Sequence, residues 1–214
     1  CSATDWPLVE FIKKKASKKK IICSLGGLSS NEISKVISFF SDNNISISYL
    51  YCVAKYPTAA KDLNLSYFKE LNQIYPNKVI GISLHEDPYE NMSGAIGYSM
   101  GARIFEKHIG VSKGKIKLNK YSTDINQMEK WLQNLSISIE QVGEIKARDK
   151  NLNFEKTQLR NFKRGVYLKS KVKKFKGEKL KLSDISLNFP AQKNQLTAND
   201  LSKFKDLILK KNIK

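Results

Sequence analysis

The chain has very little histidine, few cysteines and no long apolar run. Its 214 residues include two His and three Cys. The three cysteines, Cys1, Cys23 and Cys52, are odd in number and do not suggest a disulfide framework, so we expect packed thiols of a reduced, cytoplasmic protein. No stretch approaches the roughly 18 apolar residues of a membrane span. The first residues lack the charged start and apolar run of a signal peptide. The chain also lacks an initiator Met, so we expect a fragment and no membrane partner.

Acidic residues are scarce in the second part of the chain. The whole sequence has 38 Lys+Arg and 20 Asp+Glu. From Lys146 to Lys214 there are 20 basic and 6 acidic residues, a net charge of +14, which leaves +4 for the rest. A basic domain suggests a nucleic acid or another polyanion as partner. The lysines are scattered and no recognised nucleic-acid motif is present, so solvated lysine faces are the preferred explanation and nucleic acid is not the expected partner.

The first part of the chain repeats a strand-helix pattern. Apolar runs end near Ser24, Cys52, Ser83 and His108, at intervals of 28, 31 and 25 residues, about one βα unit each. Helical periodicity lies between them, and a longer helix is predicted over about 124–142. Such a pattern gives either a doubly wound sheet or part of a (β/α)8 barrel. The pair Gly26-Gly27 lacks the spacing of a dinucleotide fingerprint, so we prefer the barrel, of which about half is present.

The second part follows a different pattern. Residues 151–158 are interpreted as a linker. Short alternating runs and a Lys-Gly-Glu turn over 165–180 predict a small β-rich module. The module has too few residues for a large core of its own, so we expect it to dock onto another surface.

The two histidines occupy equivalent places in the repeat. His85 follows the apolar run 79–84, and His108 follows the run 102–105. Because successive parallel strands joined by a helix are neighbours, their carboxyl ends should lie side by side, where parallel α/β proteins carry their chemistry. The sequence therefore predicts a metal site at this edge. Two unrelated histidines, one packed and one exposed, remain the alternative, since two ligands are a minimal signal.

Three segments of the first part resemble the sialic acid synthase family: 51–65, with its Cys-x-x-x-Tyr-Pro block, Gly-Ile-Ser-Leu-His at 81–85, and the block 101–108 ending in Glu-Lys-His. The segment from Phe162 to Ile185 resembles the start of the family's second, antifreeze-like (SAF) domain. The resemblance implies an α/β fold: the C-terminal part of a TIM (β/α)8 barrel, about strand 4 to helix 8, over 1–145, a linker over 146–160, and a small, truncated SAF domain over 161–214. It also implies condensation of phosphoenolpyruvate with an N-acylated hexose, which would be the two substrates, and a domain-swapped homodimer.

The resemblance assigns roles to individual residues. His85 and His108 match the family's metal ligands, so a divalent metal is implied, with Mn²⁺ expected and Mg²⁺ or Co²⁺ as alternatives. Glu106 matches an acidic residue that could orient a ligand or move a proton, with a buried ion pair as the alternative. The residues that match substrate contacts are Ser2, Ser24 and Ser83 around the phosphate, Tyr56 on the sugar side, and Arg164 (or Lys163) in the SAF domain. Each serine could instead be a turn or helix cap.

Several positions depart from the family pattern, mostly on the sugar side. Ala54 stands where Asn or Ser is usual, and Leu84 replaces the Asp of Ser-Asp-His. The segment 116–122 replaces a Gly-Pro-Asp-His stretch whose Asp grips the sugar. Asn119 or Asp124 is a candidate for the missing role. These departures leave open a non-catalytic or altered-specificity paralogue. The net charge of +14 in the second part leaves open, as a weaker alternative, a basic polyanion-binding module.

Overall fold

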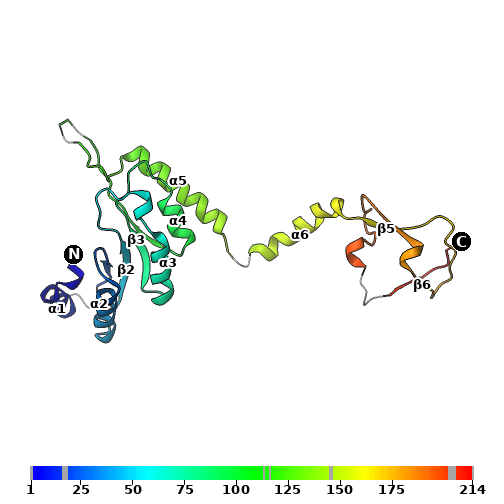
Figure 1. Cartoon of the computed structure of the whole chain (residues 1–214), viewed down its shortest axis with the longest axis horizontal. Helices are drawn as coiled ribbons and strands as arrows, with labels where there is room; N and C mark the ends of the chain where they lie inside the picture. Colours follow the sequence, from blue (N-terminus) through cyan, green and yellow to red (C-terminus); the bar gives the residue numbers. More distant parts are fainter. Residues whose placement is uncertain are drawn as a thin grey trace. The chain divides into compact units, whose positions relative to one another are not determined.

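The computed structural model describes residues 2–15, 19–112, 114–115, 117–144, 147–201 and 206–213. The chain divides into two compact units, Cys1–Gly143 and Glu144–Lys214. Figure 1 colours the first from blue to green and the second from yellow-green to red. Each unit is described by itself. Within the described ranges, no helix is both long enough and apolar enough to cross a membrane.

The first unit is built on a four-stranded parallel sheet (Figure 1). Its strands pair in sequence order and have the bounds β1 Ile21–Ser24, β2 Ile47–Cys52, β3 Val79–Ser83 and β4 Ile104–Glu106. The first three end at Ser24, Cys52 and Ser83, as the apolar runs predict, whereas β4 ends two residues before His108. The unit is therefore an α/β fold whose strand order matches half of a barrel.

Helices precede, connect and follow the strands of this sheet. Their bounds are α1 Trp6–Lys15, α2 Ser30–Asp42, α3 Leu65–Ile74, α4 Ser93–Ser99 and α5 Ile125–Val142, with short 3-10 helices η1 at Ser2–Thr4 and η2 at Ala60–Asp62. The Ser29 hydroxyl accepts from the backbone of Glu32 and so caps α2. Asp124 caps α5 in the same way through the amide of Gln127. Between β3 and β4, the residues 93–99 of α4 are helical.

The apolar faces of α2 and α3 form the core against the sheet. Val36, Phe68 and Val79 have no exposed surface, and Tyr49 and Ile82 are buried with them. Helices α4 and α5 pack closely because Gly94 has no side chain. A Cβ at Gly94 would overlap the Trp131 ring. This packing fixes α5, whose first turn follows the loop after β4.

The second unit consists of short elements. It contains α6 Ala147–Leu159, two antiparallel pairs formed by β5 Gly165–Leu168 with β7 Ile185–Asn188 and β6 Lys179–Leu180 with β8 Leu207–Ile208, and 3-10 helices η3 Arg160–Phe162, η4 Leu182–Asp184 and η5 Ala198–Asp200. The residues 151–158, interpreted as a linker, are helical and belong to α6, and the linker assignment stays a prediction. Polar residues lie all round this helix, so it has no apolar stripe to reveal it. The SAF assignment stays a prediction.

Candidate functional site

The carboxyl ends of β2, β3 and β4 lie side by side and form an edge that we call the rim. In register, Cys52 pairs with Ser83, and Ser83 pairs with Glu106. Across this last pair, the buried Ser83 hydroxyl donates to Glu106 Oε1 at 2.7 Å. The carboxylate of Glu106 is thereby held in place, while the residue itself remains exposed.

His85 and His108 meet at the rim. Their ring centroids lie 5.1 Å apart at an interplanar angle of 46°. One imidazole is buried and the other is exposed, since His85 has 5% of its surface accessible and His108 lies on the outside. The alternative of two unrelated histidines was right about this difference in exposure, but the two rings are neighbours.

The environment of His85 selects its neutral form and its tautomer. Nδ1 lies 3.1 Å from the Val53 carbonyl, which can only accept, so Nδ1 carries the proton and Nε2 keeps its lone pair. Burial lowers the pKa of His85, and the nearby His108 adds to this, against the opposing effects of the Val53 bond, Glu106 and Glu86. A neutral imidazole fixed by a backbone carbonyl is the form in which histidine binds metals.

The donor set at the rim fits an open metal site. Among the residues that the structure describes, no group of three His, Cys, Asp or Glu side chains is arranged to hold a metal ion. The two imidazoles would be the protein ligands, which suits a borderline divalent ion and leaves several coordination positions for water and substrate. The metal role of His85 and His108 stays a prediction.

A buried ion pair lies directly behind the histidines, which sequence reasoning did not identify. Lys107 Nζ lies 2.8 Å from Glu86 Oε1, and the two side chains are 5% and 1% exposed. Ser93 of α4 also donates to this carboxylate, and Trp131 Nε1 of α5 donates to the Ser93 hydroxyl at 3.0 Å. Glu86 Oε2 is buried without a hydrogen-bond partner among the described residues. Because Glu86 follows His85 and Lys107 precedes His108, the pair ties the two histidine segments together.

Two tyrosines pack against the imidazoles. The Tyr56 centroid lies 4.3 Å from that of His85, and the Tyr121 centroid lies 5.1 Å from that of His108. The two tyrosine rings are 5.2 Å apart. Tyr56 was a predicted site residue. Tyr121 was missed, although it lies in the segment 116–122 whose departure from the family pattern was the available signal.

The three serines predicted to contact the phosphate do not all line one hollow among the described residues. Ser2 and Ser24 line one hollow of about 300 Å³ together with Cys23. Ser83 is committed to Glu106. Their phosphate role stays a prediction, as does the role of Arg164, which is exposed in the second unit and whose carbonyl accepts from Ala198.

The two residues suggested for the missing sugar contact serve local structure. Asn119 Oδ1 accepts from the Tyr121 amide at 3.1 Å. Asp124 caps α5. Leu84 is buried in the core, which indicates a packing role for its side chain.

The first unit thus belongs to the parallel α/β class of proteins, and it carries two neighbouring imidazoles at the carboxyl ends of its strands. The model of the NeuB family matches residues 1–147, and the chain belongs to this family. It is 27% identical over 176 residues to a pseudaminic acid synthase of Campylobacter jejuni, covering 80% of this chain and 48% of that protein. It is 28% identical over 109 residues to human N-acetylneuraminate-9-phosphate synthase, covering 51% of this chain and 29% of that enzyme.

Among solved structures, a Chromobacterium violaceum protein described as spore coat polysaccharide biosynthesis protein E matches with a TM-score of 0.88 and 34% identity. The match covers 100% of this chain and 62% of that one. The chain spans about half the length of the pseudaminic acid synthase that it matches.

Proposed function

We propose that the full-length protein carrying this chain is a nonulosonic acid synthase, a transferase that condenses phosphoenolpyruvate with an N-acylated hexose and releases phosphate. The observation that carries the proposal is the meeting of His85 and His108 at the rim, 5.1 Å apart, beside the carboxylate that Ser83 holds. Membership of the NeuB family and the names of its relatives supply the reaction class.

The reaction forms one carbon–carbon bond. C3 of phosphoenolpyruvate attacks the aldehyde carbon of the open-chain sugar, water adds at C2, and phosphate leaves with cleavage of the C2–O bond. A divalent metal bound between His85 and His108 would polarise that aldehyde as a Lewis acid. Binding both substrates at one rim contributes through their orientation.

The residues of the chain have distinct roles in this proposal. His85 would bind the metal through Nε2, because Val53 holds Nδ1. Glu106 is placed by Ser83 to orient the acceptor or to transfer a proton at its hydroxyl groups. Ser2, Ser24 and Ser83 would donate to the phosphate, and Ser83 would have to rotate away from Glu106 to do so. Tyr56 would line the sugar side.

The proposal extends to the architecture of the whole protein. The four parallel strands would be part of a closed (β/α)8 barrel, and the second unit would be an SAF domain. Arg164 would reach the N-acyl sugar from a domain-swapped partner in a homodimer. Analytical ultracentrifugation of the full-length protein tests the dimer.

The decisive experiment is phosphate release by the full-length protein with phosphoenolpyruvate, N-acetylmannosamine and Mn²⁺. Release that requires both substrates and falls on the order of 100-fold or more in His85→Ala supports the proposal. If there is no release, bacillosamine-type and altrosamine-type acceptors are tested next. Failure with every acceptor would contradict the proposal and favour a non-catalytic paralogue.

A further inference from the structure

The loop after His108 is folded so that Tyr121 lies over the candidate site. Thr123 has no exposed surface, and both its amide and its hydroxyl donate to the His108 carbonyl at 2.9 Å. In return, the Gly110 amide donates to the Thr123 carbonyl at 3.0 Å. Asn119 holds the Tyr121 amide from the other side. Tyr121 is therefore anchored on both sides: by Asn119 on one side and, through Thr123, by the His108 backbone on the other.

The anchoring places the Tyr121 ring against both imidazoles. It is nearly perpendicular to His108, at 89°, and its centroid is 5.8 Å from that of His85 at 78°. With Tyr56 it forms an aromatic wall, which we define as these two rings. Tyr56 is 55% exposed and Tyr121 is partly exposed, so the wall also has surface open to a ligand.

Two polar side chains near Tyr121 in sequence serve local structure. Asn119 accepts from the Tyr121 backbone amide, and Asp124 caps α5. The surface that Tyr56 and Tyr121 present beside the imidazoles is aromatic. Aromatic faces bind C–H groups and methyl groups, whereas hydroxyl groups gain more from carboxylates.

We propose that Tyr121 is an acceptor-binding residue, which packs with Tyr56 against the C–H face or the N-acyl methyl group of the sugar. This inference rests on the proposed function and deepens it. In this chain, an aromatic contact from Tyr121 would take the place of the Asp contact to the sugar that the family pattern has in this segment. The ring, rather than the phenol hydroxyl, supplies the contact, so phenylalanine should substitute for tyrosine.

The test compares Tyr121→Ala and Tyr121→Phe in the full-length protein at saturating Mn²⁺. In Tyr121→Ala, the KM for the acceptor should rise about three- to tenfold, the range expected for one aromatic contact. The KM for phosphoenolpyruvate and kcat should change less than twofold. Tyr121→Phe should restore the acceptor KM. Tyr89→Ala is the matched control, because Tyr89 is 83% exposed and lines a different hollow with Asn126 and Lys130.

Mn²⁺ affinity, measured by electron paramagnetic resonance, separates this role from simple packing on the imidazoles. If Tyr121→Ala weakens Mn²⁺ binding while the acceptor KM stays within twofold of wild type, Tyr121 only positions the histidines and the inference is overturned. Thermal unfolding of each variant shows whether it is folded. If Tyr121→Ala is not folded, the pair Tyr121→Phe and Tyr121→Leu replaces it, and equal acceptor KM values in that pair would likewise overturn the inference.

The two proposals fail in distinguishable ways. Phosphate release with an unchanged acceptor KM in Tyr121→Ala would leave the proposed function standing without this inference. If the wild type releases no phosphate, binding of N-acetylmannosamine to the protein with phosphoenolpyruvate is followed by saturation-transfer NMR. Binding that Tyr121→Ala weakens would support the inference, and binding that is absent or equal in the two proteins would overturn it.

Discussion

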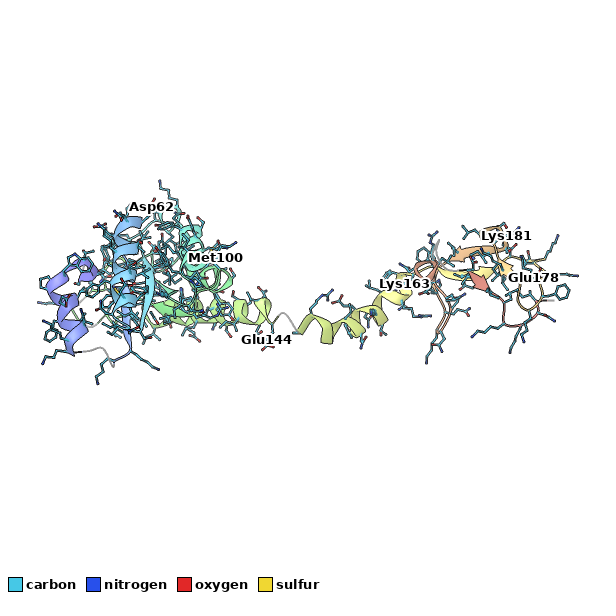
Figure 2. All side chains as sticks on the ribbon, turned by 90° about the horizontal axis from the view of Figure 1, so that it is seen from below. Asp62, Met100, Glu144, Lys163, Glu178 and Lys181 are labelled. Atoms are coloured by element: carbon cyan, nitrogen blue, oxygen red, sulfur yellow. The ribbon has the colours of Figure 1, made fainter. Side chains whose placement is uncertain are left out.

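Different interactions stabilise the interior of each of the two units. In the first, apolar side chains of α2 and α3 pack on a four-stranded sheet, and the buried cluster extends from Ala3 to Ala102. In the second, Ile185 and Ala191 are the buried apolar side chains of the described residues, and many bonds are made by caps and loops. Figure 2 shows side chains crowded within the first unit and pointing outward around the second, where Lys163, Glu178 and Lys181 are labelled.

The hydrogen bonds of the second unit illustrate the difference. Arg160 donates to the carbonyls of Gln192 and Gln195, and Gln195 donates in turn to the Val166 carbonyl. Asp184 and Asp200 each accept from a backbone amide three residues earlier. Such bonds contribute about 1 kcal/mol each, less than a buried aliphatic or aromatic side chain. A site that requires side chains fixed within an ångström is therefore expected on the first unit, where the histidines are.

The largest expected effect contrasts two lysines in ion pairs. Lys107→Met leaves Glu86 charged, buried and without its partner, and should lower the free energy of unfolding of the first unit by about 3–5 kcal/mol. Lys174→Met removes a more exposed pair with Asp184 in the second unit and should have a much smaller effect. Both tryptophans, Trp6 and Trp131, lie in the first unit, so tryptophan fluorescence in urea measures the unfolding of that unit, and amide NMR signals measure the unfolding of the second.

A double variant provides the control for this contrast. Glu86→Gln combined with Lys107→Met removes both charges and should recover part of the lost stability. If Lys107→Met costs no more than Lys174→Met, the pair is not a structural element of the site.

Substitution of one glycine in each unit should have smaller effects on stability and tests whether the two units unfold independently. Gly94→Ala places a methyl group against the Trp131 ring, and overpacking of this kind costs about 1–3 kcal/mol. Gly177 in the second unit has open space around it but a φ of +90°, so Gly177→Ala should cost about 1 kcal/mol through backbone strain. Urea unfolding followed by tryptophan fluorescence should shift for Gly94→Ala and not for Gly177→Ala. A shift in both would mean that the two units unfold together.

The sequence predicts what depends on local pattern. Apolar runs placed three strand ends at Ser24, Cys52 and Ser83, and Asp124 was included at the start of the long helix that became α5. The rule that parallel neighbours share an edge predicted that the two histidines would meet. These features follow from periodicity and chain connectivity, which a single sequence contains.

The rest depends on contacts between distant residues. Lys107 pairs with a carboxylate 21 residues earlier, which no spacing rule predicts. Tyr121 reaches the imidazoles only because the irregular loop after His108 is tied back by Thr123. Helix α6 has no apolar stripe, so its pattern resembles a linker. For Lys107 and Tyr121 the missing information is the tertiary partner, and for α6 it is the apolar stripe that would have marked a helix.

The smallest expected effect is a different response of the two units to acid. Burial holds the pKa of His85 below its ordinary value of 6.5, so the unfolded chain binds more protons at this position. With metal removed by a chelator, the stability that His85 contributes is complete well above pH 6.5 and is lost as the pH falls through 6.5 toward the folded pKa. Hydrogen bonds from the backbone lower the pKa values of Asp184 and Asp200 below 3.8. The stability that Asp184 and Asp200 contribute persists until the pH falls below that value. The free energy of unfolding of the second unit should therefore not change between pH 7.5 and 5.5.

Urea unfolding between pH 7.5 and 5.5 checks this difference, with tryptophan fluorescence for the first unit and amide NMR signals for the second. His85→Asn is the control, because an amide can still donate to the Val53 carbonyl but does not titrate. The pH slope of the first unit should flatten in this variant. A wild-type slope that is zero, or one that His85→Asn leaves unchanged, would show that burial of His85 does not couple the rim to the stability of the first unit.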